Sequence, residues 1–306
     1  MKHKKFVSAV VYVRNAEDGI EGFLRTIHGV FTNSFEKFEF VCVNDASLDG
    51  SKDRLRAFAD SVPDCMVSVV NMGFFQGVEK SMLAGLDLAI GDFVFEFDSI
   101  IIDYEPDMVM ECFERGIQGF DIVACGTGGG GAFSRLFYFL FNRHSGSQYD
   151  LRSETFRVLS RRAINRVHSM SPNPVYRKAL YSNSGLRMEH LIYRPLLASA
   201  SGKRNLKSPH DTAVTSLILF TNVAYKATLF LSLIMMLATF VAITYIVVVF
   251  FQGIAAPGWT TTMIVLSGAF FVHFAVMAVV IKYLSVLLEL VFQRQRYVLD
   301  SIEKLT

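Results

Sequence analysis

Short apolar runs alternate with amphipathic stretches over the first part of the chain. Four runs have the length and composition of buried β-strands, at residues 6–13, 38–43, 92–97 and 121–125. Between them, apolar residues recur at helical spacing in three stretches, at residues 19–31, 51–59 and 77–89. Strands that alternate with helices of about 10–15 residues are typical of βαβ units. The pattern therefore predicts an α/β domain with a mostly parallel sheet.

A second pattern begins near residue 226. Two apolar runs, 227–251 and about 261–281, contain no Asp, Glu, Lys or Arg. The helices that we expect from them, about 227–251 and 261–283, are each long enough to cross a hydrocarbon core of ~30 Å. The connection between them has no Lys or Arg, whereas basic residues flank both outer ends. The positive-inside rule then places both termini in the cytoplasm. We expect an amphipathic juxtamembrane segment at 206–226, a transmembrane hairpin at 227–290 and a cytoplasmic tail at 291–306.

Composition supports this division and excludes several classes of protein. The chain of 306 residues is 52% hydrophobic and only 19% charged, which is low for a soluble globule. A net charge of +2 does not indicate a nucleic-acid-binding protein. The four cysteines lack paired spacing, which favours free thiols in a reducing compartment. The first apolar run is broken by Arg14 and Asn15, so it indicates a strand and not a signal peptide.

Polar residues follow the predicted strands at their carboxyl ends. Asn15 and Glu17 follow the first strand, Asn44 and Asp45 the second, and Asp98 follows the strand that ends at residue 97. Ligands of parallel sheets bind beyond the carboxyl ends of the strands. The pattern therefore predicts a binding cleft there, without identifying its ligand.

Several motifs resemble those of family-2 glycosyltransferases. Residues 43–51 (VNDASLDGS) are similar to the family's VDDGSTDGT motif, residues 8–17 to its opening strand, and residues 71–92 to its N-x-G…AGL…GD stretch. Residues 156–162 (FRVLSRR) resemble the FRLxSRR helix of the polyprenyl-phosphate branch, and the basic tail at 293–297 resembles that branch's ending. The resemblance implies a GT-A (Rossmann-like) domain over residues 1–205. It also implies inverting transfer of a sugar from a nucleotide-sugar to a polyprenyl phosphate, for cell-surface glycans.

The resemblance also assigns residues to the donor. The residue matching Asp45 recognises the base in the family, and Asp98 matches the first aspartate of the Asp-x-Asp motif, which holds a divalent cation, Mg²⁺ or Mn²⁺. The other positions assigned to the nucleotide-sugar are Asn15, Glu17, Asn71 and Gln76. For Asp45 a turn-capping role is the alternative, since Asn-Asp-Ala-Ser also favours a turn.

On the acceptor side, the family places a carboxylate just before the Phe-Arg pair. Asp150 and Glu154 are the candidates, with an ordinary surface loop as the alternative for each. Arg157 and Arg161, four residues apart on the expected helix, are the expected phosphate partners. Family members usually carry an arginine just after the strand that ends here at residue 125, whereas this chain has a glycine-rich run at 126–131. Arg135 is the cation nearest to that run in the sequence.

One departure from the family pattern keeps a second function open. Ile100 replaces the second aspartate of the metal motif, and one carboxylate is a poor set for a hard cation. The alternatives are a degenerate relative that binds nucleotide-sugar or lipid and scaffolds a partner, and an enzyme that makes a lipid diphosphate or modifies an existing glycan. In each case the expected location is a bacterial inner membrane, and the two helices leave room for packing between copies of the chain.

Overall fold

The computed structural model describes residues 2–128, 148–170, 176–196 and 297–306, with scattered positions within 135–143 and 230–287. The chain divides into two compact units, Met1–Ala213 with Gln295–Thr306, and Val214–Arg294. Within the described residues, no helix combines the length and apolar character needed to cross a membrane. The expected juxtamembrane segment lies outside the described residues, as does most of the expected hairpin.

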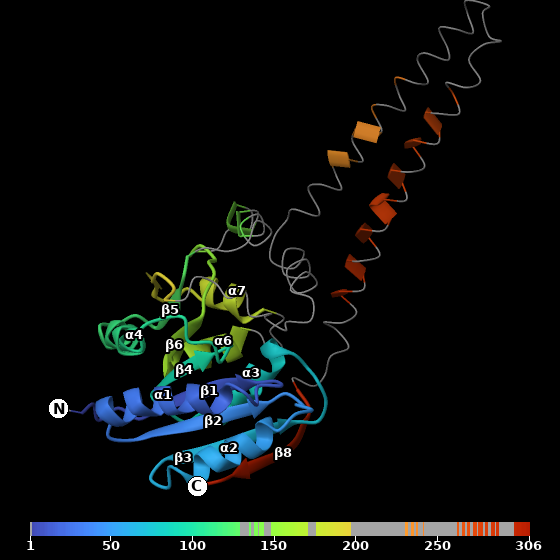
Figure 1. Ribbon diagram of the computed structural model, residues 1–306. Helices are drawn as coiled ribbons and strands as arrows, with labels where there is room; N and C mark the ends of the chain where they lie inside the picture. The colour runs from blue at the N-terminus through green and yellow to red at the C-terminus, as the bar shows by residue number, and fades with distance from the viewer. Residues whose placement is uncertain are drawn as a thin grey trace, which may run out of the picture. The chain divides into compact units, whose positions relative to one another are not determined.

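The described strands of the first unit form one mixed sheet in the order β7-β5-β6-β4-β1-β2-β3-β8 (Figure 1). Their bounds are β1 (Val7–Val13), β2 (Phe38–Asn44), β3 (Met66–Met72), β4 (Phe93–Phe97), β5 (Ile122–Gly126), β6 (Phe156–Ser160), β7 (Met188–Ile192) and β8 (Leu299–Lys304). Only β6 and β8 of these strands run antiparallel to their neighbours. The predicted α/β fold with a mostly parallel sheet is confirmed.

Helices cover both faces of this sheet. One face packs against α1 (Ile20–Ser34), α2 (Ser51–Asp60) and α4 (Asp107–Ile117), whose apolar side chains form the main core with alternate strand residues. The other face carries α3 (Val78–Leu88), α6 (Arg161–Met170) and α7 (Arg177–Ser182). The three predicted helices correspond to α1, α2 and α3. Each has an apolar stripe that the sheet buries.

The segment FRVLSRR does not form the expected helix. Phe156–Ser160 is strand β6, antiparallel to both β4 and β5, and α6 begins only at Arg161. Phe156 and Val158 join the main core, so Arg157 between them points to the other face, as the two-residue period of a strand requires. The prediction that Arg157 and Arg161 share a helix face is therefore wrong.

The C-terminal residues belong to the first unit. Leu299–Lys304 form β8, which pairs antiparallel with β3 and provides an edge of the sheet. The Asn71 amide donates to Ser301 Oγ at 3.0 Å and to Glu303 Oε1 at 2.9 Å. The stretch expected to be a tail thus contains a strand of the domain that was expected to end at residue 205.

Candidate functional site

The loops that follow β1 and β2 are joined by hydrogen bonds at the carboxyl edge of the sheet. Asn15 Oδ1 accepts from Leu48 N at 2.9 Å, and Glu17 Oε2 accepts from Gly50 N at 3.0 Å. Asn15 (φ 46°) and Ala46 (φ 50°) both adopt left-handed backbone conformations, which cost energy and persist only where the surrounding structure holds them. Asn15 and Glu17, which the sequence assigns to nucleotide-sugar binding, therefore hold these two loops together.

Asp45 is completely buried and anchors the start of α3. Its Oδ1 accepts from Gln76 N at 2.8 Å, and its Oδ2 accepts from Gly77 N and the Tyr12 hydroxyl, each at 2.9 Å. Burial and the Asp45 carboxylate raise the pKa of Tyr12 well above its usual range. The turn at residues 44–47 is capped instead by Asn44, whose Oδ1 accepts from Ser47 N at 3.1 Å. Asp45 therefore does not cap its own turn in this structure.

Asn71 and Gln76 connect the same edge to the C-terminal segment. The Asn71 Oδ1 atom accepts from Asn44 Nδ2 at 3.0 Å, in addition to its bonds with β8. Gln76 forms two bonds with the backbone of Val298, donating at 2.6 Å and accepting at 3.0 Å. The structure thus brings Asn15, Glu17, Asp45, Asn71 and Gln76 to one edge, with hydrogen-bond partners inside the chain for every one of them.

A network of buried charges lies beside these loops, which we name the charged cluster. It consists of Glu79, Glu96, Asp98, Glu154, Arg157 and Arg177. The Arg157 guanidinium is fully buried. Its nitrogens lie 2.6 Å from Glu96 Oε2, 2.8 Å from Asp98 Oδ2 and 3.1 Å from Glu154 Oε2.

Arg177 binds the same carboxylates from the other side. Its Nη2 lies 2.7 Å from Asp98 Oδ1, its Nε lies 2.9 Å from Glu79 Oε2, and its Nη1 donates to Glu96 Oε1. Burial by itself would raise the pKa of Asp98, but the Arg157 and Arg177 guanidinium groups hold it well below its usual range. Each oxygen of Glu96 and Asp98 therefore accepts from one of the two arginines.

The residues at the expected metal motif do not fit a divalent cation. Both Asp98 oxygens are held by arginines. Ile100 and Ile102 pack against the main core, and Asp103 accepts a hydrogen bond from the Tyr193 hydroxyl. The part of the chain that the structure describes contains no group of three His, Cys, Asp or Glu residues arranged to hold a metal.

Glu154 is the expected acceptor-side carboxylate that the structure places at this edge. Its side chain is 1% exposed, and Oε1 has no hydrogen-bond partner among the described residues. Lys178 Nζ lies 3.9 Å from Oε2, and His190 Nδ1 lies 4.0 Å from Oε1. Burial lowers the pKa of His190, so its ring is neutral near pH 7. Asp150, the other candidate, is exposed.

The remaining predicted cations lie elsewhere. Arg161 donates to the carbonyl oxygens of Ala89 at 2.9 Å and of Gly91 at 3.0 Å. These atoms lie at the amino end of β4, because Ser160 pairs with Phe93. Arg161 is therefore at the opposite edge of the sheet from Asp98 and does not share a site with Arg157. Arg135 is exposed, and the glycine run is described only as far as residue 128.

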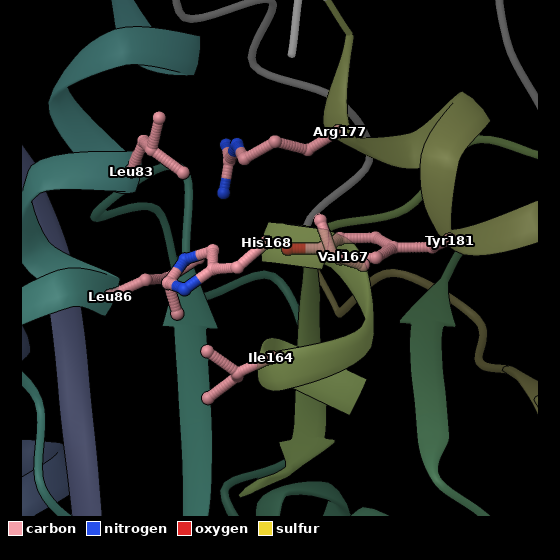
Figure 2. Close-up of a pocket in the computed structure, with 7 residues that line it drawn as sticks. All are labelled: Leu83, Leu86, Ile164, Val167, His168, Arg177 and Tyr181. Carbon is pink, nitrogen blue, oxygen red and sulfur yellow. The ribbon is translucent and has the colours of Figure 1, made fainter. Parts of the chain in front are cut away.

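A hollow lies between α3, α6 and α7, next to the charged cluster (Figure 2). It is lined by Leu83, Leu86, Ile164, Val167, His168, Arg177 and Tyr181. Its space does not accommodate a water molecule, so it is a packing feature and not a ligand site. Figure 2 shows Arg177 extending from α7 across this hollow toward α3.

Three of the six residues of the charged cluster, Glu79, Glu96 and Arg177, are not predicted from the sequence. Glu96 had a usable signal, since it is a single charge inside the apolar run FVFEF, and a buried charge requires a partner. Arg177 had none, because the chain must fold before it meets Glu96, which lies 81 positions earlier in the sequence. The same holds for Tyr181, whose hydroxyl donates to Glu96 Oε1 at 2.9 Å.

Comparison with known proteins gives matches over most of the chain. The profile of glycosyl transferase family 2 matches residues 8–167, just over half of the chain. An uncharacterized glycosyltransferase of Synechocystis sp. is 24% identical over 305 residues, covering 97% of this chain and 95% of the relative. A prophage bactoprenol glucosyl transferase homolog of Escherichia coli is 27% identical over 196 residues, covering 61% of this chain and 62% of the relative.

Two further matches are more partial. An undecaprenyl-phosphate 4-deoxy-4-formamido-L-arabinose transferase of Pseudomonas paraeruginosa is 32% identical over 117 residues, covering 38% of this chain and 34% of the relative. A mannosyltransferase structure from Pyrobaculum calidifontis, in complex with GDP-Man and Mn²⁺, gives a TM-score of 0.48 at 17% identity, covering 74% of this chain and 64% of that one.

Proposed function

Because the chain belongs to glycosyl transferase family 2, we propose that this glycosyltransferase moves a sugar from a nucleotide-sugar to a polyprenyl phosphate. The acceptor class is supported by relatives whose names specify bactoprenol and undecaprenyl phosphate. The match spans less than two thirds of the length of those two relatives.

The observation that supports this proposal most directly is the buried carboxylate of Glu154, whose Oε1 atom has no hydrogen-bond partner among the described residues. Glu154 lies beside Asp98 at the carboxyl edge, because Phe156 pairs with Phe97 at the end of β4. Its Oε2 is bonded to Arg157, so Oε1 is the atom left to accept a proton. A buried carboxylate oxygen without a partner is costly. A group that donates a hydrogen bond to it would remove that cost.

In the proposed reaction, an oxygen of the acceptor phosphate attacks the anomeric carbon of the donor. The bond from that carbon to the diphosphate oxygen breaks, the nucleoside diphosphate leaves, and the configuration at the carbon inverts. Where the phosphate carries a proton, Glu154 Oε1 receives it, and the Lys178 ammonium offsets the charge of the phosphate. Because a phosphate is already ionised, its position contributes more than its activation by a base.

The test is transfer to polyprenyl phosphate by purified protein, with several nucleotide-sugars as donors and mass spectrometry of the lipid product. We expect Glu154→Gln to lower turnover by roughly 10²-fold. Asp150→Asn tests the other candidate carboxylate in the same assay, and Glu114→Gln, which changes an exposed carboxylate on α4, should leave turnover unchanged. Full turnover in Glu154→Gln would remove Glu154 from the mechanism. The absence of a glycolipid product with every donor would reject the function.

A scaffold without transfer activity is the second candidate function, and one observation favours it. The Asp98 carboxylate is occupied by two arginines, so the expected metal motif is not available in this arrangement. In that case the same assay gives no product, while nucleotide or lipid binding persists. A binding measurement with UDP, GDP and polyprenyl phosphate distinguishes this outcome from a misfolded preparation.

The proposal includes a membrane anchor at 227–290, with the first unit and both termini on the cytoplasmic side of a bacterial inner membrane. In the second unit, many apolar side chains at the described helical positions are exposed, among them Phe230, Leu237, Val241 and Leu287, as expected for a lipid-facing surface. A cysteine placed at Gln295 should react with a membrane-impermeant reagent only after the cells are opened. Labelling in intact cells would reverse the orientation.

A further inference from the structure

Three carboxylates surround a single guanidinium at the carboxyl edge of the sheet. Glu79 comes from α3, Glu96 from β4 and Asp98 from the residue after β4, and each of the three nitrogens of Arg177 contacts one of them. The backbone N–H of Arg177 also donates to Glu79 Oε2 at 3.0 Å. Both the backbone and the side chain of this residue are thus fixed by the carboxylates.

Without Arg177, the three carboxylates would face one another with only Arg157 to offset them. Like charges this close disfavour ionisation and destabilise the fold. Carboxylates are also the ligands that a divalent cation uses in proteins, but the oxygens of these three are spaced here around a guanidinium and do not form a metal-binding group. The side chain of Arg177 is 1% exposed, so the guanidinium fills this space.

We propose that Arg177 is the resident cation of this three-carboxylate site, in the place where the family resemblance assigns a divalent metal to Asp98. A cation attached to the chain neutralises the carboxylates without dependence on free metal. Arg157 completes the arrangement by holding the other oxygens of Glu96 and Asp98. The consequence for transfer rests on the proposed function: turnover should not require a divalent ion bound at Asp98. The expected Mn²⁺ binding of the parent and of its variants does not depend on the proposed function.

The test measures Mn²⁺ binding to the purified full chain by electron paramagnetic resonance, with no nucleotide and then with UDP or GDP. We expect no Mn²⁺ site that depends on Asp98 in the parent protein. Arg177→Ala should create one, with a dissociation constant roughly tenfold or more below that of any residual Mn²⁺ binding to the parent, because ligand charge sets the affinity of such sites. Mn²⁺ should also raise the thermal midpoint of Arg177→Ala but not that of the parent.

Two variants complete the design. Adding Asp98→Asn to Arg177→Ala should abolish the new Mn²⁺ site. Arg162→Ala, which removes an arginine whose side chain is 76% exposed, should create no site. A folded Arg177→Ala protein that binds no Mn²⁺ would overturn the inference, as would Mn²⁺ binding by the parent that is lost in Asp98→Asn. If Arg177→Ala does not fold, the parent and Asp98→Asn measurements decide.

These outcomes separate the inference from the proposed function. A parent protein that has no Mn²⁺ site and makes no glycolipid would support the role of Arg177 and reject transfer. A parent protein that makes glycolipid only with Mn²⁺ bound through Asp98 would support transfer and reject the role of Arg177. Transfer that continues in excess EDTA would support both.

Discussion

At the scale of single residues, the charged cluster shows how the charges of a buried site are offset by neighbouring side chains. Four carboxylates, those of Glu79, Glu96, Asp98 and Glu154, face the two arginines. The Lys178 ammonium lies within 3.9 Å of one of them. Removing one member of such a set leaves an uncompensated buried charge, which costs more than the pair contributes.

The stability of the folded protein at low pH depends on the ionised carboxylate of Asp98 in the charged cluster. The pKa of Asp98 in the folded chain is held below its usual range by Arg157 and Arg177, against the opposing effect of burial. The stabilisation is therefore present above the unfolded-state pKa of about 3.9 and is lost as the pH falls below it. We expect the thermal midpoint of the parent to fall more steeply between about pH 5 and pH 3 than that of Asp98→Asn. The control Asp64→Asn, at an exposed position, should keep the parent's slope. An equally steep fall in Asp98→Asn would contradict the assignment.

Ile100 stands where the family motif has its second aspartate, but it serves the core. Ile100 packs against the main core. Its Cδ1 atom lies so close to Gly19 that a Cβ atom at position 19 would be only 3.0 Å from it. Ile100→Asp should therefore lower the free energy of unfolding by about 1–3 kcal/mol without creating a Mn²⁺ site. Ile101→Asp is the matched control, because Ile101 is 45% exposed. Mn²⁺ binding gained by a stable Ile100→Asp protein would refute this.

At the scale of elements, β6 and β8 are the two described strands that run against the rest of the sheet. β6 carries Arg157 between two core residues, which places the guanidinium on the α7 face, opposite the main core. β8 is the last strand on the β3 side of the sheet, and there Asn71 of β3 bonds to both Ser301 and Glu303. Each of these strands therefore joins a distant part of the chain to the site.

Asn71 provides a test of the β3–β8 connection. Asn71→Ala removes the bonds to Ser301 and Glu303 and leaves the Asn44 amide without its partner. We expect a loss of about 1–3 kcal/mol in the free energy of unfolding. Hydrogen exchange should become faster at residues 299–304 before it does so in β1 or β2. Asn33→Ala, at an exposed position of α1, is the control. Unchanged exchange in β8 would show that the backbone pairing alone holds the strand.

At the scale of the whole molecule, the first unit is assembled from both ends of the chain. Residues 297–306 bond to Gln76 and Asn71, which lie at the carboxyl ends of the strands together with the loops after β1 and β2. A chain that ends at residue 296 would expose the β3 edge, and such edges are prone to pair with other chains. We expect this truncation to lower the thermal midpoint and a peptide of residues 297–306 to raise it again as its concentration increases. A scrambled peptide should have no effect, and full stability of the truncated chain would argue against a structural role for β8.

The sequence by itself determined the family, the α/β class, the first helices and the edge at which the polar loops gather. These follow from local periodicity and from motifs that are contiguous in the chain, and the family profile over residues 8–167 confirms the resemblance. Local patterns also produced the main error, because FRVLSRR fits a helix by motif likeness and a strand by its alternation of Phe156, Arg157 and Val158.

Only the tertiary structure decided what the polar residues at the edge do. Asp45, Asn71 and Gln76 bond to residues 27 to 232 positions away, and Arg177 meets Asp98 across 79 positions. The identity of a residue fixes its charge and its hydrogen-bonding groups, whereas its partners depend on which strands become neighbours. The sequence therefore placed Asp98 at the site, and the fold determined that arginines hold both of its oxygens.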